Sequence, residues 1–480
     1  MSATISAKPG VPGSDLEYSV SVLVVGGGAC GCVAALAARD AGAGVLFIER
    51  DARAMGSTGM SQGLFYAAGT KAQAAAGIED DGATFFADIM AKTRGQTDPV
   101  IAHAIAYGSG PTADWLADRH DMPWTLDLGF RPAFGNSRFR VHGWHGHGGI
   151  DMVPLPHQKL ADAGVDVLLK TALSNVVADE AGRVLGVEIA PPDGSIERIG
   201  CETLILASGG FAASHAMVAE FIPAMAGARN NGHESSQGIG MTFGAKLGGV
   251  FADMGSYQGD AMLTDPQGIS VAPGVIVEGG VIVNVDGRRF TDETADIAGM
   301  VLPVMAQPGG HCWVVFDAAI EKRCAYIPET QALIALNAAR TAEAVEVLAD
   351  SIGVPADVLA ATLDDTRSAQ AECRPDAQGR VWGKDTPPAP AYRALKVVGA
   401  IYHTLGGLQI DGSARVRRAD GSPLPNLFAG GGAARSVSGP AEWGYLPAMQ
   451  LCTAITLGRI AGEAAARQTL EQELRGTFNA

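Results

Sequence analysis

Residues 21–49 read SVLVVGGGACGCVAALAARDAGAGVLFIE, and this stretch decides the fold. The apolar run 21–25 is typical of a strand buried on both faces, and it leads directly into glycines. The Ala-rich segment 32–41 predicts a helix, and residues 45–48 predict a second buried strand that ends at Glu49. A strand, a loop with GxGxxG spacing, a helix, a strand and an acid together form the unit of a dinucleotide-binding, Rossmann-type domain.

The glycines of this loop have separate expected roles in holding a pyrophosphate. Gly26 would make the tight turn, Gly28 would let the backbone approach the phosphates, and Gly31 would let the helix pack close to the strand. The start of the helix would face the phosphates, because its dipole favours negative charge. Glu49 stands about 20 residues after the glycines, where a carboxylate binds ribose hydroxyls. NAD and FAD both use this unit, so it does not choose between them.

Two further buried strands run into glycines much later in the chain. Residues 204–210 read LILASGG, and residues 427–432 read LFAGGG. Separate strand–glycine junctions of this kind let distant segments converge on one long cofactor. The pattern resembles the FAD-binding flavoproteins of the fumarate reductase and 3-ketosteroid dehydrogenase superfamily.

The resemblance extends from about Ser21 to Ala466 and rests on the order and spacing of several motifs. These motifs are GSTGMSQG at 56–63, GRVLGV at 182–187, the glycines of 238–245, VIVN at 281–284 with GRRFTDE at 287–293, HTLGG at 403–407 and GRIAG at 458–462. In the family, the first of them lies beside the flavin N5 edge. The resemblance implies an α/β fold, in which a Rossmann-type FAD-binding domain carries an inserted α+β capping domain.

The same resemblance implies the domain boundaries. The FAD-binding domain is expected in residues 18–235 and 398–480, and the capping domain in residues 236–397, with the active site between them. Residues 1–17 are polar and rich in Gly, Pro and Ser, so we expect a disordered lead-in there. The FAD is expected to be bound without a covalent link, because the loop 56–63 contains no histidine.

The residues expected to hold the FAD come from the glycine loops, the acid after the second strand and the start of the last helix. They are Gly26, Gly28, Ala29, Cys30, Gly31, Glu49, Arg50, Ser57, Thr58, Gly59, Met60, Ser61, Gly63, Val176, Ala207, Ser208, Gly209, Gly210, Gly431, Gly432, Leu446, Pro447, Ala448 and Met449. Amides at the start of the last helix would stabilise negative charge at N1 and O2 of the reduced flavin.

The segment before the last helix bears on the substrate. Fumarate-reducing members of the family clamp dicarboxylates with arginines, one of them in a GANRLGG-type segment, whereas residues 439–447 here read GPAEWGYLP. Tyr445 stands close to the expected arginine, and no proton-shuttling arginine follows soon after Glu293. A buried carboxylate without a bidentate partner costs roughly a few kcal/mol in desolvation, so these departures disfavour fumarate.

Tyr445 is therefore expected to be the acid/base. Ketosteroid dehydrogenases of the family use a tyrosine to take a proton from the carbon next to a carbonyl. His403 and Tyr402 would orient or polarise that carbonyl, and Tyr257 would assist from the capping domain. Core packing is the alternative for Tyr257 and Tyr402, and His403 could instead brace the turn at 406–407.

These residues predict an FAD-dependent dehydrogenase of a CH–CH bond next to a carbonyl. The expected partners are a small-molecule carbonyl substrate, either a cyclic ketone or a 3-oxosteroid, and an external electron acceptor or donor. A reductase of an activated double bond, such as that of an unsaturated acid, is the first alternative, because one site serves both directions. A non-catalytic flavin electron-carrier subunit is the second alternative.

Composition disfavours several other classes. A net charge of −16 over 480 residues argues against a nucleic-acid partner, and no apolar run reaches the ~18 residues that a membrane span needs. Seven scattered cysteines without haem or zinc spacing predict reduced thiols, a cytoplasmic location and no metal site. The Arg/His cluster at 138–147 is expected to be a flavin-side or substrate-gate loop, and metal binding there is disfavoured.

Overall fold

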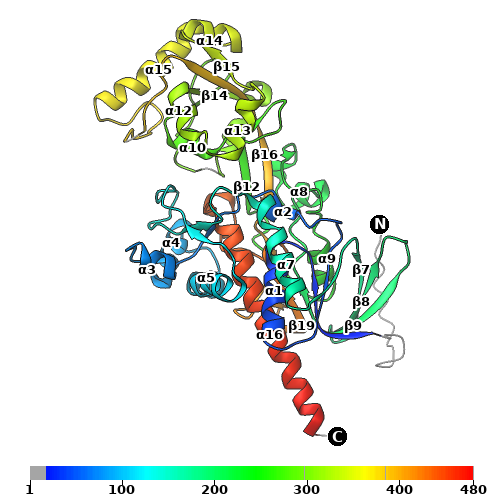
Figure 1. Cartoon of the computed structure of the whole chain (residues 1–480). Helices are drawn as coiled ribbons and strands as arrows, with labels where there is room; N and C mark the ends of the chain where they lie inside the picture. Colours follow the sequence, from blue (N-terminus) through cyan, green and yellow to red (C-terminus); the bar gives the residue numbers. More distant parts are fainter. Residues whose placement is uncertain (1–17, 297, 384, 479–480) are drawn as a thin grey trace. The chain divides into compact units, whose positions relative to one another are not determined.

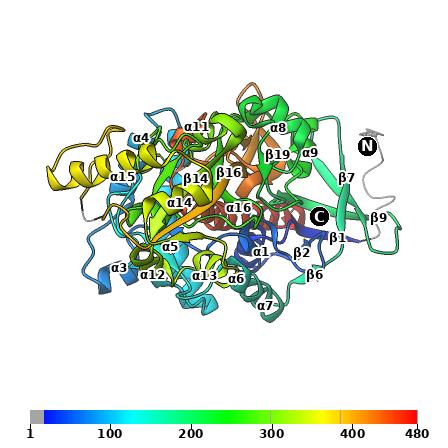
Figure 2. The same ribbon diagram turned by 90° about the horizontal axis from the view of Figure 1, so that it is seen from above.

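The structure is a computed structural model that describes residues 18–296, 298–383 and 385–478 (Figures 1 and 2). The lead-in expected at residues 1–17 lies outside the described residues.

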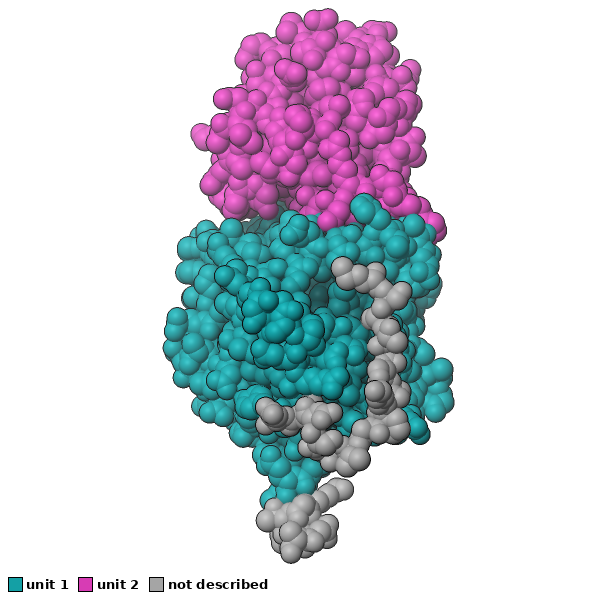
Figure 3. Space-filling model, turned by 90° about the vertical axis from the view of Figure 1, so that its right-hand side faces the viewer, with its two compact units in different colours: residues 1–222, 232–257, 403–480 teal, residues 223–231, 258–402 magenta. Residues whose placement is uncertain are grey.

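The chain divides into two compact units, which Figure 3 colours separately. Unit 1 comprises residues 1–222, 232–257 and 403–480, and unit 2 comprises residues 223–231 and 258–402. Most of the segment 236–397 belongs to unit 2, and its expected role as a capping domain stays a prediction.

Unit 1 is built on an eight-stranded sheet. Its strands are β1 (Ser19–Val25), β2 (Val45–Ile48), β6 (Asp166–Leu168), β7 (Ala172–Ala178), β8 (Val184–Ala190), β9 (Glu197–Leu206), β18 (Arg415–Arg417) and β19 (Pro423–Ala429). β1 pairs in parallel with β2 on one side and with β9 on the other, so that Val22 lies opposite Val45 and Thr203. β9–β19 and β2–β6 are also parallel, whereas β7, β8 and β18 join by antiparallel pairing. The predicted strand–loop–helix–strand unit therefore lies in the middle of a largely parallel sheet.

Two helices, α1 (Ala29–Asp40) and α16 (Met449–Phe478), pack along this sheet and lie side by side (Figures 1 and 2). Glycines let their backbones approach closely. A Cβ at Gly458 would lie 2.5 Å from the carbonyl oxygen of Cys30, and one at Gly462 would collide with that of Ala34. Residues 29–38 are all buried, because α1 contacts both the strands and α16. The Ala- and Gly-rich composition of these helices is thus a packing requirement.

The remaining elements of unit 1 surround this core. α5 (Pro99–His120) begins after Asp98, whose carboxylate accepts a hydrogen bond from the amide of Val100 at 2.9 Å and so caps the helix. The other elements are α2 (Gly56–Gly59), β3 (Phe65–Tyr66), α3 (Lys71–Ala75), α4 (Gly82–Lys92), β4 (Thr125–Leu126), β5 (Val141–Gly143), α6 (Gly149–Met152), α7 (Pro154–Asp162), α8 (His215–Phe221), α9 (Ile239–Lys246), β11 (Phe251–Ala252) and β17 (Gly407–Leu408).

Unit 2 is built on a six-stranded sheet around β16 (Tyr392–Thr404), whose last two residues belong to unit 1. The strands that join it are β10 (Arg229–Asn230), β12 (Tyr257–Thr264), β13 (Val281–Val283), β14 (His311–Asp317) and β15 (Arg340–Ala342). Its helices are α10 (Pro273–Val277), α11 (Val301–Met305), α12 (Ala318–Cys324), α13 (Pro328–Ala335), α14 (Val345–Ile352) and α15 (Ala356–Ala371).

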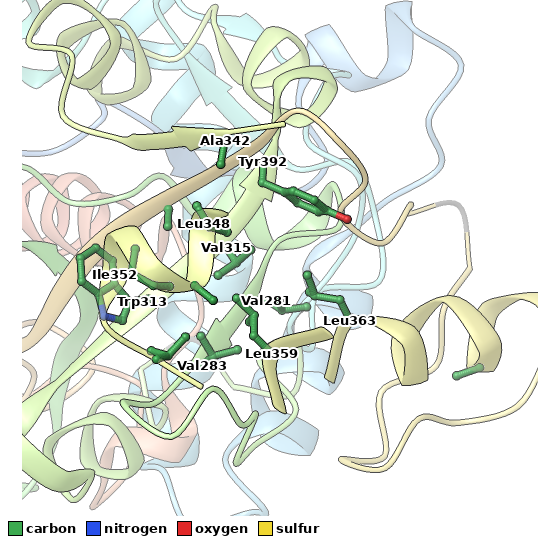
Figure 4. Packing of buried hydrophobic residues seen from close by; sticks show 14 of the residues in the cluster. Val281, Val283, Trp313, Val315, Ala342, Leu348, Ile352, Leu359, Leu363 and Tyr392 are labelled. Atoms are coloured by element: carbon green, nitrogen blue, oxygen red, sulfur yellow. The ribbon is translucent and has the colours of Figure 1, made fainter. Parts of the chain in front are cut away.

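A hydrophobic core lies between this sheet and two of the helices, α14 and α15 (Figure 4). Alternate residues of the strands supply one side of it, such as Val281 and Val283 of β13. Leu348 of α14 and Leu359 of α15 supply the other side, and both are fully buried. The parallel Rossmann-type sheet of unit 1 and the mixed α+β unit inserted into it confirm the predicted fold class.

A buried ion network holds the GRRFTDE motif in unit 2. Arg289 donates two hydrogen bonds to Glu293, of 2.8 and 2.7 Å, and also binds Asp376. The guanidinium of Arg380 is fully buried, and it donates to Asp385 at 2.8 Å. Removing one partner from such a network would leave an uncompensated buried charge, so we interpret this motif as structural.

Candidate functional site

The glycine loop between β1 and α1 is shaped by close backbone contacts. Gly26 has a φ of +114°, and a Cβ there would collide with the carbonyl of Ala207 at the end of β9. A Cβ at Gly31 would collide with the carbonyl oxygen of Gly26, which gives the close helix–strand approach. At Gly28 a Cβ would meet the hydroxyl of Thr58 at 3.2 Å. The geometry at these positions suits a loop that lets a pyrophosphate approach the backbone.

Glu49 is fixed at the end of β2 beside this loop. Its carboxylate accepts hydrogen bonds from the amide of Gly27 at 2.5 Å and from that of Asp51 at 2.7 Å. Each carboxylate oxygen keeps a further lone pair, so the group can still accept bonds from ribose hydroxyls. The guanidinium of Arg50 pairs with Asp51 at 3.0 Å, and its side chain is 44% exposed.

The loop 56–63 is anchored to the start of α1. The hydroxyl of Thr58 accepts a hydrogen bond from the amide of Ala29 at 3.0 Å. The hydroxyl of Ser61 donates to the carbonyl of Thr58 at 2.7 Å and accepts from the amide of Gly63 at 3.1 Å. The loop expected beside the flavin is therefore fixed to the loop expected beside the phosphates.

The three strand–glycine junctions converge in unit 1. A Cβ at Gly432 would lie 2.6 Å from the amide nitrogen of Gly210, and one at Gly430 would lie 2.6 Å from Sγ of Cys30. Burial raises the pKa of the Cys30 thiol to about 12, so this thiol is a neutral packing group. The buried hydroxyl of Ser208 has no hydrogen-bond partner among the described residues. A glycine cradle with an unsatisfied buried hydroxyl fits a polar cofactor such as FAD, which would supply the missing partner.

The other residues expected to touch FAD differ in exposure. Val176, Ala207 and Gly210 are buried, as is Gly59; Gly209 and Gly431 are half-buried, and Ser57 and Met60 are exposed. Contact between these side chains and FAD stays a prediction.

The start of α16 supplies a second feature that suits a flavin. Ala448 enters the helix with a φ of +61°, and the amide of Met449 donates to the carbonyl of Leu446 at 3.2 Å. Leu446 and Met449 are buried, and Pro447 is half-buried. The first-turn amides of a helix lack partners within the helix and carry the positive end of its dipole. This helix start can therefore stabilise an anion, as the pyrimidine edge of a reduced flavin requires.

Three of the four expected catalytic side chains belong to unit 1. Tyr445 follows the short 3-10 turn Glu442–Gly444 and is 6% exposed. Its ring centroid lies 6.4 Å from that of His403, with the ring planes at 61°. Tyr257 is 2% exposed. The fourth, Tyr402, belongs to unit 2, where its hydroxyl lies 2.8 Å from that of Ser270.

The imidazole of His403 is held in its neutral form. Removal from water lowers the pKa of His403 to about 4, although its backbone contact with Thr404 acts in the opposite direction. The hydroxyl of Thr404 accepts a hydrogen bond from the amide of Phe211 at 3.0 Å, which fixes the end of β16 beside the second glycine junction. At neutral pH this histidine can donate or accept a hydrogen bond, but it carries no positive charge.

Arg435, the arginine next to the third glycine junction, is already paired. Its guanidinium donates to Asp253 at 2.6 and 3.0 Å and to Asp98 at 3.0 Å, and only 9% of its side chain is exposed. Asp98 also caps α5, so this arginine joins three distant segments of unit 1. Sequence patterns did not indicate either carboxylate, because Asp98 stands 337 positions before Arg435.

Two side chains of the Arg/His cluster at 138–147, Arg140 and His142, lie in the interior of unit 1, whereas the other Arg and His side chains of the cluster are exposed. Arg140 is fully buried and binds Asp80 at 2.7 and 2.8 Å and also binds Asp88. The ring of His142 contacts the hydroxyl of Thr70 at 2.9 Å and the carbonyl of Arg140 at 2.8 Å. These contacts fix the two side chains, and the expectation of a flavin-side or substrate-gate loop stays a prediction.

Within the described ranges, no group of three or more His, Cys, Asp or Glu side chains is arranged to hold a metal ion. A search of the same residues finds no helix long and apolar enough to cross a membrane.

Comparison with known proteins places this geometry in context. The model of the FAD binding domain family matches residues 21–445. A probable fumarate reductase, Ifc3, of Shewanella frigidimarina is 28% identical over 456 residues, which are 95% of this chain and 76% of that protein. A 4-oxocyclohexanecarboxylate 2-dehydrogenase of Sinomonas cyclohexanicum is 27% identical over 540 residues, covering 93% of each chain.

Solved structures give the same result for the fold. The open conformation of a flavocytochrome c3 fumarate reductase superposes with a TM-score of 0.81 at 28% identity, covering 95% of this chain and 79% of that one.

Proposed function

Because this chain belongs to the FAD binding domain family and is an FAD-dependent oxidoreductase of the type that acts on carbon–carbon double bonds, we propose that it desaturates a cyclic ketone next to its carbonyl. The site residues, the substrate class and the direction of the reaction are all part of this proposal. The resemblance to a 4-oxocyclohexanecarboxylate dehydrogenase supports the substrate class, and the arrangement of unit 1 supports the roles of the residues.

The observation that carries the proposal is the neutral state of His403, whose ring is in contact with that of Tyr445, together with the pairing of Arg435, which stands ten positions before Tyr445. A carboxylate substrate needs a cation, preferably the bidentate fork of an arginine. His403 is neutral, and the guanidinium of Arg435 is shared between two carboxylates. A neutral carbonyl, in contrast, needs only hydrogen-bond donors. This combination therefore favours a ketone over a dicarboxylate.

In the proposed reaction Tyr445, acting as the phenolate, takes the proton from the carbon next to the carbonyl. His403 donates a hydrogen bond to the carbonyl oxygen, which makes that carbon more acidic as negative charge develops on the oxygen. Tyr402 orients the same carbonyl. The bound cofactor would supply the oxidising power of the reaction, as the acceptor of the hydride that leaves the β carbon. The products are the conjugated ketone and the reduced cofactor, with one proton on Tyr445.

The FAD would be held by the glycine cradle, by Glu49 at the ribose and by loop 56–63 at the isoalloxazine ring. The first turn of α16 would face the pyrimidine edge. Burial of Tyr445 and Tyr257 would exclude water from the reacting face.

A second candidate function is the reduction of an activated double bond. The 28% identity to a fumarate reductase over 95% of the chain favours it. The same side chains would serve, with Tyr445 giving a proton instead of taking one.

The experiment that tests the proposal is anaerobic absorbance spectroscopy of the FAD-loaded protein. The substrates are cyclohexanone-type ketones, a 3-oxosteroid and succinate. We expect a ketone to bleach the oxidised flavin band and succinate to leave it unchanged. Bleaching by succinate, without bleaching by any ketone, would contradict the substrate class that we infer from the neutral His403 and the paired Arg435. Rapid oxidation of dithionite-reduced enzyme by an unsaturated acid would support the second candidate.

A further inference from the structure

Unit 2 contains a buried carboxyl group that is bonded only to neutral donors. Asp260, in β12, is 7% exposed. Its Oδ1 accepts a hydrogen bond from the amide of Met262 at 2.9 Å. Its Oδ2 accepts from Nδ2 of Asn231 at 3.1 Å and also from the hydroxyl of Ser270. Among the described residues, none of these hydrogen-bond donors is a cation.

The hydroxyl of Ser270 connects this carboxyl group to Tyr402. It lies 2.8 Å from the phenol oxygen of Tyr402, and it accepts a hydrogen bond from Nδ2 of Asn231 at 3.0 Å. A serine hydroxyl has one proton and can donate it to one partner at a time. The protonation state of Asp260 therefore decides the direction of the whole chain of hydrogen bonds.

The two directions have different consequences for Tyr402. When Asp260 is ionised, it can only accept, so Ser270 donates to it and Tyr402 must donate to Ser270. When Asp260 is protonated, it donates to Ser270, and Ser270 donates to the phenol oxygen of Tyr402. Only in the second state is the proton of Tyr402 free for another acceptor, such as a carbonyl oxygen.

Burial favours the second state. Burial raises the pKa of Asp260, and this effect outweighs its three hydrogen bonds. Burial also raises the pKa of Tyr402, and the negative charges of Asp260 and of Glu329 in α13 act in the same direction. The basic side chains Arg229 of β10 and Lys396 of β16 both pair with Asp265.

We propose that Asp260 is a positioning residue that controls, through Ser270, whether Tyr402 can donate a hydrogen bond to the substrate carbonyl. The step is a concerted reorientation along the chain: each hydroxyl donates to the next oxygen, and no electrons are transferred. Protonated Asp260 is the active state, and its ionisation withdraws the phenol proton from the substrate. The inference rests on the proposed function, which places Tyr402 at the carbonyl.

The first test is the pH dependence of flavin reduction by a ketone in the FAD-loaded enzyme. In the wild type, the rate is expected to fall about tenfold per pH unit above the ionisation of Asp260. Asp260→Asn cannot ionise, and its amide can donate to Ser270 as the protonated acid does, so its rate should stay constant over that range. Ser270→Ala removes the hydroxyl that links Asp260 to Tyr402, so it should also abolish this fall in rate at high pH.

Asp265→Asn is the matched control, because Asp265 directly follows β12 but pairs with the cations Arg229 and Lys396. It should keep the wild-type pH profile. Thermal unfolding and the absorbance of bound FAD distinguish a variant that has lost its fold from one that has lost only the control of Tyr402 by Asp260. A wild-type pH profile in Asp260→Asn would overturn the inference.

A second readout does not need a substrate. Infrared difference spectra of wild type minus Asp260→Asn should contain the carbonyl band of a protonated carboxyl group at neutral pH, and the band should vanish as the pH is raised. Presence of this band without bleaching by any ketone would contradict the proposed function but not the state of Asp260. Absence of the band at neutral pH would overturn the proposed control of Tyr402 by Asp260, even if a ketone bleaches the flavin.

Discussion

Two buried carboxylate sites in this chain are stabilised in opposite ways. In unit 1, Asp98 and Asp253 share the guanidinium of Arg435, which holds their segments together. In unit 2, Asp260 is bonded to a hydroxyl, an amide side chain and a backbone amide. An arginine partner favours the charged form of a carboxyl group and connects the segments that carry the two side chains. A carboxyl group bonded only to neutral donors can change its protonation state more easily. This difference separates a structural acid from a functional one.

Removing the cation from the first site should give the largest effect. Arg435→Met leaves two carboxylates without their partner, and we expect a loss of about 3–5 kcal/mol in the free energy of unfolding. Urea unfolding at neutral pH measures it. Arg435→Lys keeps the charge but not the fork, so its loss should be smaller. A loss below about 1 kcal/mol in the Met variant would mean that the three segments do not depend on this arginine.

The neutral state of His403 predicts a pH-dependent stability of intermediate size. Its pKa is about 4 in the fold and about 6.5 in the unfolded chain, so the unfolded chain binds the proton more readily. Stability is therefore lost as the pH falls from about 6.5 towards about 4. His403→Gln cannot titrate and should lose less stability than the wild type between pH 7.5 and pH 5, by roughly 2 kcal/mol. Urea unfolding at the two pH values measures this loss. An equal loss in the wild type and in His403→Gln would contradict the neutral state of His403.

The titration of Asp260 predicts a pH-dependent stability of the opposite sign. Because its pKa is raised in the fold, the wild type gains stability from this group below the unfolded pKa of about 3.9 and loses it as the pH rises through the folded value. Asp260→Asn should therefore be more stable relative to the wild type at pH 7.5 than at pH 4. Each pH unit by which the folded pKa exceeds the unfolded pKa adds about 1.4 kcal/mol to this difference between the two proteins. A constant difference between the two proteins would show that Asp260 does not titrate on unfolding.

The local sequence pattern was sufficient to predict the dinucleotide-binding unit. Residues 21–49 contain the buried strands, the glycine spacing and the acid within one continuous stretch, and each depends mainly on its neighbours in sequence. The later junctions at 204–210 and 427–432 were recognisable for the same reason. Together they predicted the Rossmann-type α/β unit, and the family resemblance that they carry implied the FAD cofactor.

The buried polar contacts could not be predicted in the same way. Asn231, Asp260, Ser270 and Tyr402 come from four separate segments, and none of them belongs to a spaced motif. The position of Arg140 also depends on tertiary contacts, because its partners lie 52 and 60 residues away in the sequence. Sequence spacing gives no signal for a side chain whose hydrogen-bond partners come from distant segments.

Tyr445 is proposed to act where fumarate-reducing members of the family are expected to use an arginine, and Tyr445→Phe tests this role. The measurement is the rate of anaerobic flavin reduction by a cyclic ketone, in variant and wild-type proteins with equal bound FAD. Removal of the general base should slow the reaction by about 10²–10⁴-fold, while the FAD spectrum and thermal stability stay near those of the wild type. A variant that retains its FAD and reduces it at close to the wild-type rate would contradict the account.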